Sequence, residues 1–110
     1  MLNQVGLNID FTEKKMIRVI IDRYIAETLE KNYESAAIEV LSASVRAPGF
    51  ISGESLCDLD NPRHRIVLCK WRSRLDWDNW CQTQERKDLM GKLSLMLEKE
   101  ETVTVLDSPH

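Results

Sequence analysis

The sequence predicts a single α+β domain of the ferredoxin-like βαββαβ type, with a four-stranded antiparallel sheet and its helices on one face. Three observations predict this fold. The 110 residues suffice for one domain but not for two. The candidate elements follow one another as strand, helix, strand, strand, helix, strand. Two helices cover only one face of such a sheet, yet the first and third candidate strands carry apolar residues on both faces.

The first strand is expected to begin near Met16, where the sequence IRVIIDRYI is rich in β-branched residues. Residues 1–15 show weak periodicity and are expected to form an N-terminal extension, followed by one domain over residues 16–110. Alternate side chains of this strand point to opposite faces. One face carries Ile17, Val19 and Ile21, and the other carries Arg18, Ile20, Asp22 and Tyr24.

The next element is expected to be a helix, because apolar and small side chains recur with a 3.6-residue period from Tyr33 to Val45. Asn32 is a candidate N-cap, and the pair Pro48-Gly49 is expected to stop the helix. A second strand is expected over residues 50–57. Within it, Gly53 indicates either a bulge or the close approach of another group.

A turn is expected between Asp58 and Arg63, around the sequence Asp-Asn-Pro. The third strand is then expected over residues 64–71. Ser73 is expected to cap a short helix through a capping box, with Trp77, Trp80 and Cys81 on one side of it. A longer helix is expected from about residue 85 to 98, and a fourth strand over residues 102–106.

Composition narrows the possible partners. Apolar residues make up 43% of the chain and charged residues 30%, and the net charge is −3. A net negative charge argues against a nucleic-acid partner. No apolar run is long enough to cross a membrane and no apolar signal core stands at the N-terminus, so no membrane association and a cytoplasmic location are expected.

The three cysteines, Cys57, Cys69 and Cys81, include no C-x-x-C pair, so they are expected to be buried thiols that act as small hydrophobic side chains. Only two histidines are present, at positions 64 and 110, so no metal site is expected. The charged residues around 85–88 and 98–101 are expected to lie on the solvated surface.

A sheet with two apolar faces needs a cover for the face that the helices leave open. The least costly cover is a second copy of the same sheet, so a homodimer with facing sheets is expected.

The segment from Met16 to Leu106 resembles the antibiotic biosynthesis monooxygenase family. The resemblance is carried by the opening strand, the sequence APGF, the Asp-Asn-Pro turn, the strand that ends in Cys69-Lys70-Trp71, and the segment Arg72-Ser73…Trp77…Trp80. The family implies a dimeric α+β barrel and a pocket between the sheet and the helices of each subunit. Some members oxidise quinols or anthrones with molecular oxygen and no cofactor, and others degrade haem.

The resemblance also indicates departures. Haem-degrading members carry an Asn on the first strand, a Trp on the second helical segment and a His ten residues later, where this chain has Asp22, Trp80 and Met90. The imidazole ligand is missing, which disfavours haem degradation. Quinone-forming members carry an Asn near the strand-end Trp, where this chain has Val67 and Leu68.

These observations give two functional hypotheses. The first is a cofactor-independent monooxygenase that oxidises a small aromatic molecule, with Asp22 as the catalytic base and Tyr24, Trp71 and Trp80 as substrate-binding residues. Strand parity places Arg18, Asp22 and Tyr24 on one face, which is expected to be the polar wall of the pocket. The second hypothesis is a non-catalytic small-ligand-binding or regulatory module.

Each candidate residue also has a structural interpretation. For Asp22 it is an ion pair with Arg18 or Arg23, for Tyr24 it is packing alone, and for the two tryptophans it is filling of the core. A third functional class, an RNA-binding sheet, shares the element order but needs a Gly-aromatic signature that residues 64–71 lack.

Overall fold

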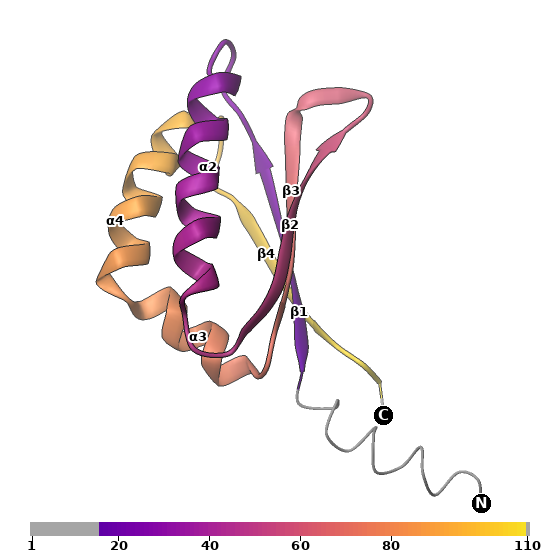
Figure 1. Ribbon diagram of the computed structural model, residues 1–110. Coiled ribbons are helices and arrows are strands. Elements are labelled where there is room, and N and C mark those ends of the chain that lie inside the picture. Colours follow the sequence, from indigo (N-terminus) through magenta and orange to yellow (C-terminus); the bar gives the residue numbers. More distant parts are fainter. Residues whose placement is uncertain (1–15, 110) are drawn as a thin grey trace, which may run out of the picture.

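Four antiparallel strands form one sheet in the order β2-β3-β1-β4, and the helices pack against one of its faces (Figure 1). The computed structural model describes residues 16–109, so the extension expected over residues 1–15 lies outside the described residues. The ferredoxin-like fold is confirmed. Its elements are β1 (Ile17–Tyr24), α2 (Glu30–Val45), β2 (Phe50–Asp58), β3 (Asn61–Trp71), α3 (Arg74–Gln82), α4 (Gln84–Leu93), the 3₁₀ helix η1 (Ser94–Met96) and β4 (Thr102–Asp107).

Burial in the central strand β1 distinguishes the two faces of the sheet. Ile17, Val19 and Ile21 are buried beneath the helices, whereas the alternate residues are exposed or only partly buried. The same alternation holds in β3, where Val67 and Cys69 belong to the core cluster. The face turned away from the helices is called the outer face below, and no element of the described chain covers it in Figure 1.

Helix α2 begins earlier than the sequence predicts. Its N-cap residue is Leu29, without a side-chain cap, and Asn32 lies inside the first turn instead of capping the helix. The earlier start goes with packing of Leu29 against a second core cluster, which consists of Ile25, Tyr33, Ala36, Ala37, Val40 and Leu93. The stop is close to the expected place, because the helix ends at Val45 and the chain reverses at Gly49, which has a φ of 89°.

The hairpin between β2 and β3 is tighter than expected. Asn61 and Pro62 belong to β3 and not to the turn, which leaves only residues 59–60 between the strands. A proline is tolerated there because the pairing of β3 with β1 begins only at His64. The irregularities in β2 fall between Phe50 and Ser52 and between Cys57 and Asp58, and not at the glycine. Gly53 instead meets the close approach of a helix side chain, since a Cβ there would lie 3.0 Å from Cδ1 of Leu41.

The two C-terminal helices, α3 and α4, each begin at an N-cap whose side chain accepts a backbone hydrogen bond. Ser73 caps α3 by accepting a hydrogen bond from the backbone N–H of Asp76, as predicted. Thr83 caps α4 in the same way, so only this residue separates the two helices. The helix expected to reach residue 98 ends at Leu93 and continues as η1. None of the helices in the described part of the chain is long and apolar enough to cross a membrane.

Candidate active site

A cavity lies between the sheet and the helices, and its wall is largely apolar, with one aromatic side. All three tryptophans of the chain line it: Trp71 from the end of β3, and Trp77 and Trp80 from α3. The Trp71 and Trp80 rings are stacked with centroids 6.4 Å apart, and Trp77 meets Trp71 edge-on at 5.6 Å. The cavity has about 30 Å³ for the centre of a water-sized sphere, which is room for roughly two water molecules.

A cluster of charged side chains closes the polar end of this cavity. Arg23 of β1 and Arg86 of α4 both line it. Nε of Arg23 donates to Oε1 of Glu101 at 2.8 Å, and an Nη atom of Arg86 lies 3.5 Å from Oε2 of the same carboxylate. Arg23 also donates to the hydroxyl of Tyr33 at 3.2 Å. We call Arg23, Arg86 and Glu101 the arginine cluster.

The arginine cluster is withdrawn from solvent. The side chain of Arg23 is 2% exposed, that of Arg86 is 12% exposed and that of Glu101 is 14% exposed. Burial opposes the charge of Arg23, but Tyr33 and Glu101 outweigh it and raise the pKa of the guanidinium. The expectation that residues 85–88 and 98–101 are all solvated surface is therefore wrong for Arg86 and Glu101, because each pairs within the core.

The cysteines have different surroundings. Cys69 is buried in the cavity wall and accepts a hydrogen bond from the indole N–H of Trp71 at 3.4 Å. Burial raises the pKa of the Cys69 and Cys81 thiols, so both stay protonated and behave as apolar groups. Cys57 is exposed, in contrast to the expectation of burial, because it lies at the edge strand β2.

Asp22 and Tyr24 do not line the cavity. They lie on the outer face of β1, opposite to the face that carries Arg23. The expected polar wall formed by Arg18, Asp22 and Tyr24 is therefore not part of the cavity, because the side chains of one strand alternate and Ile21 and Arg23 point inward. Of the four residues expected at the site, the structure brings together only Trp71 and Trp80.

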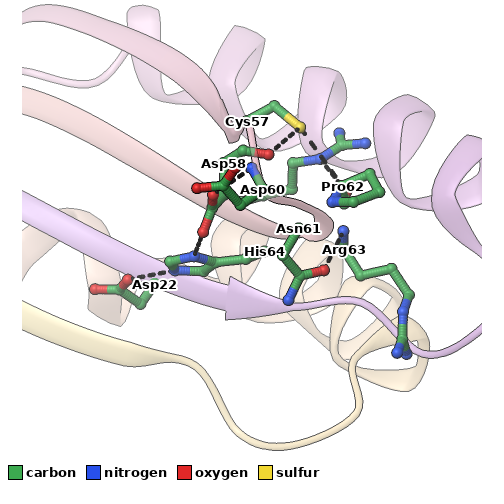
Figure 2. A network of polar contacts seen from close by, with 9 residues as sticks. Asp22, Cys57, Asp58, Asp60, Asn61, Pro62, Arg63 and His64 are labelled. Carbon is green, nitrogen blue, oxygen red and sulfur yellow. Dashed lines mark hydrogen bonds and ion pairs between the residues drawn. The ribbon is translucent and has the colours of Figure 1, made fainter.

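Asp22 instead holds His64, as Figure 2 shows. Nε2 of His64 lies 2.9 Å from Oδ1 of Asp22, and Nδ1 lies 2.8 Å from Oδ2 of Asp58. The ring stacks on Tyr24 with centroids 4.4 Å apart, and Nζ of Lys99 lies 4.5 Å from the centre of the Tyr24 ring. We call Asp22, Asp58 and His64 the histidine clasp.

The clasp favours a charged imidazole. Hydrogen bonds to Asp58 and then to Asp22 raise the pKa of His64, and the hydrogen bond from His64 lowers the pKa of Asp58. Asp22 is thus part of an ion pair, as its structural interpretation expects, but its partner is His64 and not Arg18 or Arg23.

Three functional candidates were missed from the sequence, namely the members of the arginine cluster. A signal for Arg23 was present, because it continues the alternation of Ile17, Val19 and Ile21, the more apolar of the two sets. Arg86 and Glu101 gave no such signal, since each stands among other charged residues and is buried only through tertiary packing.

Comparison with known proteins bears on the family. Residues 16–92 match the family model described as antibiotic biosynthesis monooxygenase, which is more than half of the chain. The chain belongs to the antibiotic biosynthesis monooxygenase family. No curated protein matches the sequence.

Solved structures agree with this family at the level of the fold. A conserved protein from Methanosarcina mazei has a TM-score of 0.83 at 18% identity and covers 90% of this chain and 98% of its own. SnoaB, a cofactor-independent oxygenase from Streptomyces nogalater, has a TM-score of 0.79 at 10% identity and covers 87% of this chain and 95% of its own. Rv0793 from Mycobacterium tuberculosis has a TM-score of 0.78 at 15% identity, with coverages of 86% and 96%.

Met90 stands where haem-degrading members of the antibiotic biosynthesis monooxygenase family carry a His, and here its side chain contacts Arg23. Its sulfur lies 3.8 Å from an Nη atom of Arg23 at the edge of the arginine cluster. Among residues 16–109, no three His, Cys, Asp or Glu side chains are placed to hold a metal ion together.

Proposed function

We propose that this protein is a cofactor-independent monooxygenase that oxidises a small quinol- or anthrone-like aromatic molecule with molecular oxygen. The substrate binds in the cavity between the sheet and the helices, with Trp71 and Trp80 packing against its rings. The observation that carries the proposal is the aromatic wall of that cavity in a chain of the antibiotic biosynthesis monooxygenase family. Flat aromatic molecules gain contact area and favourable ring geometry against such a wall.

The chemistry needs little from the protein beyond a shielded site. An anthrone loses one proton from its CH₂ group, and the carbanion transfers an electron to O₂. The resulting radical and superoxide combine to form a C–O bond and a peroxide. Loss of the second C–H proton breaks the O–O bond and gives the quinone, while the second oxygen atom leaves as water. Exclusion of bulk water by the cavity protects the carbanion and the peroxide.

The size of the cavity favours a small substrate. Room for roughly two water molecules does not admit even one ring until side chains or helices move. The tryptophans of α3 form one side of the cavity, and α3 is joined to α4 through the single residue Thr83. We propose that these two helices move outward together when a substrate binds.

The test is oxygen consumption by the purified protein with a panel of quinols and anthrones, with the quinone product identified by mass spectrometry. Trp80→Leu removes half of the stacked pair and is expected to lower kcat/KM by about tenfold or more, which corresponds to roughly 1.4 kcal/mol. Arg74→Gln changes an exposed residue of the same helix and is expected to leave it unchanged. A panel without any oxygen consumption beyond the uncatalysed rate contradicts the proposal.

A second candidate is a non-catalytic module that binds a small aromatic ligand in the same cavity. It is favoured by the absence of a carboxylate or imidazole from the cavity lining within residues 16–109, which leaves the wall without an evident base. Thermal stabilisation by members of the panel without turnover supports this candidate over the oxygenase.

We also propose that the working unit is a homodimer in which two outer faces meet. The central strands expose part of Ile20, Ile66 and Leu68 on that face, and Leu56 and Leu106 flank them with 42% of each side chain exposed. Arg18 and Lys70 stand opposite each other at one end of the face, and Asp22 and Asp58 lie toward the other. A twofold axis between these ends brings positive groups of one copy near negative groups of the other.

A further inference from the structure

We propose that the arginine cluster is a recognition site for an anionic oxygen of the aromatic ligand, either a carboxylate or an ionised phenol or enol. The inference rests on the proposed function, because it takes the same cavity as the substrate site. The ligand's ring lies against the tryptophans, and its charged oxygen accepts hydrogen bonds from Arg86, with Arg23 adding positive charge beside it.

Charge balance is the first argument. The cluster contains two guanidinium groups and one carboxylate, Glu101, so one positive charge is left over. Tyr33, another polar partner of Arg23, accepts a hydrogen bond through its hydroxyl and adds no carboxylate to the cluster. An uncompensated charge in a buried site is costly, and an anion that enters the cavity removes that cost.

The hydrogen bonds of Arg86 are incomplete. Its Nε atom is buried and has no hydrogen-bond partner in the described part of the chain. Its contact with Glu101 is 3.5 Å long, whereas Arg23 holds the same carboxylate at 2.8 Å. Glu101 therefore belongs mainly to Arg23, and Arg86 keeps a buried donor for another acceptor.

Arg86 lies beside the aromatic side of the cavity, where it can meet a charged oxygen of a ring-bearing ligand. Its guanidinium lies over the Trp77 ring, with Cζ 5.4 Å from the ring centre, and it lines both the cavity and an open surface depression whose other charged residues are Lys87, Glu100 and Glu101. A ligand that enters from this depression meets Arg86 before it reaches the tryptophans. A planar guanidinium suits a carboxylate or phenolate oxygen, with which it forms charge-assisted hydrogen bonds.

This assignment has a chemical consequence for the proposed reaction. A site that binds the ionised form of its substrate lowers the pKa of a phenol or enol that enters as the neutral form. The proton then leaves to water before or during binding. The cavity wall needs no base of its own for that step, which agrees with its lining.

The test is isothermal titration calorimetry at pH 7 with 2-naphthoate and 2-naphthamide, which share a ring system and differ in charge. The naphthoate is expected to bind at least about tenfold more tightly, as a hydrogen bond to a charged group allows. A second pair, 4-nitrophenol above and below its own pKa, separates phenolate recognition from carboxylate recognition. Preference for the charged form in either pair supports the proposal and identifies the oxygen, and equal affinity within both pairs overturns it.

Arg86→Gln is the diagnostic variant, because it keeps the chain length and removes the charge. It is expected to reduce the preference to within about twofold, whereas Arg74→Gln, an exposed control, leaves it unchanged. Arg86→Lys is expected to keep part of the preference, because it retains the charge without the planar donors. A preference that survives unchanged in Arg86→Gln overturns the proposal. Arg23 is not substituted, since loss of a fully buried cation would confuse binding with folding.

Calorimetry needs no turnover, so the two proposals fail separately. A preference for the anion without oxygen consumption by any substrate contradicts the oxygenase and leaves this inference standing. Oxygen consumption together with equal affinity for charged and neutral ligands contradicts only this inference.

Discussion

Asp22 and Arg23 are neighbours in the chain but act on opposite faces of the sheet. Asp22 holds His64 on the outer face at 2.9 Å, and Arg23 holds Glu101 beside the aromatic cavity at 2.8 Å. A substitution at one of these positions therefore tests a different structure from a substitution at the other.

Asp22→Asn is expected to leave the rate of oxygen consumption unchanged, because this side chain does not face the cavity. It removes one charged partner of His64 and is expected to lower the free energy of unfolding by at most about 1 kcal/mol, since the pair is partly exposed. Oxygen uptake and urea unfolding on the same preparation measure both effects. A large loss of rate with unchanged stability would restore Asp22 as the base.

The sequence predicts the aromatic half of the site and not the charged half. Trp71 and Trp80 were chosen through the resemblance to the antibiotic biosynthesis monooxygenase family, whose members carry tryptophans at or near the pocket, and the structure places both in the cavity wall. Arg23 was missed although it continues the apolar set of Ile17, Val19 and Ile21, because a charged residue is seldom buried unless it is paired, and its partner was not evident from the sequence. Burial of Arg86 and Glu101 depends on the packing of α4 and on the approach of residue 101 to β1, which no local pattern encodes.

At the scale of elements, the histidine clasp joins three strands. Asp22 comes from β1, Asp58 from β2 and His64 from β3, so one imidazole ties the end of the β2–β3 hairpin to the central strand. The other groups that face it are Tyr24, which stacks on its ring, and Lys99 beyond Tyr24.

The clasp is expected to make stability depend on pH. The pKa of His64 is raised in the folded state, so its contribution is complete below about 6.5, the unfolded value, and is lost as the pH rises through the folded pKa. The pKa of Asp58 is lowered, so its contribution is lost as the pH falls below about 3.9 and through the folded pKa.

Urea unfolding of the wild type and of His64→Gln across this range measures the effect. The difference in free energy of unfolding is expected to be largest between about pH 4 and 6.5 and to shrink above that interval. The protection of the β2–β3 hairpin amides against hydrogen exchange, relative to the intrinsic rate at each pH, is expected to fall over the same rise in pH. A difference between the two proteins that does not change with pH contradicts the assignment.

Two glycines provide a matched pair for testing backbone strain, because one has a positive φ and the other lies inside a helix. Gly49 has a φ of 89°, and a Cβ there would lie 2.3 Å from Cγ of Asp76, so Gly49→Ala is expected to lower the free energy of unfolding by about 1–3 kcal/mol. Gly91 lies in α4 with no atom within 4 Å of the position of its Cβ, so Gly91→Ala is expected to raise it by about 0.5–1 kcal/mol. Thermal and urea unfolding measure both, and equal effects would contradict the strain at Gly49.

The order and type of the elements follow from the sequence, whereas several boundaries do not. The alternation of β1 and the 3.6-residue period of α2 are strong local signals. Asn61 and Pro62 look like turn residues, but pairing with β2 extends β3 over them. Asn32 looks like a cap, but the helix starts three residues earlier, with Leu29 as its N-cap.

At the scale of the whole molecule, the uncovered face of the sheet leads to the expected dimer. Leu68 lies near the centre of this face, opposite Ile20 and Glu54 on the neighbouring strands. Leu68→Glu places a charge where the two sheets are proposed to meet and is expected to convert the dimer into a monomer. Leu75→Glu on α3, a residue 66% exposed on the helix layer, is the matched control and is expected to leave the dimer intact.

Analytical ultracentrifugation at micromolar concentration measures this outcome for the three proteins. A wild-type protein that sediments as a single chain contradicts the dimer. A Leu68→Glu protein that remains paired places the contact on another surface.

The gathering of all three tryptophans around one cavity has a practical consequence. The indole emission of this protein originates from side chains around that one cavity, and no tryptophan lies in β4 or in residues 56–66 at the turn end of the β2–β3 hairpin. Quenching or a wavelength shift of the tryptophan fluorescence therefore reports binding in the cavity without any attached dye. Events confined to the turn end of the hairpin do not change this emission, so the spectrum separates filling of the cavity from opening of the hairpin at its turn.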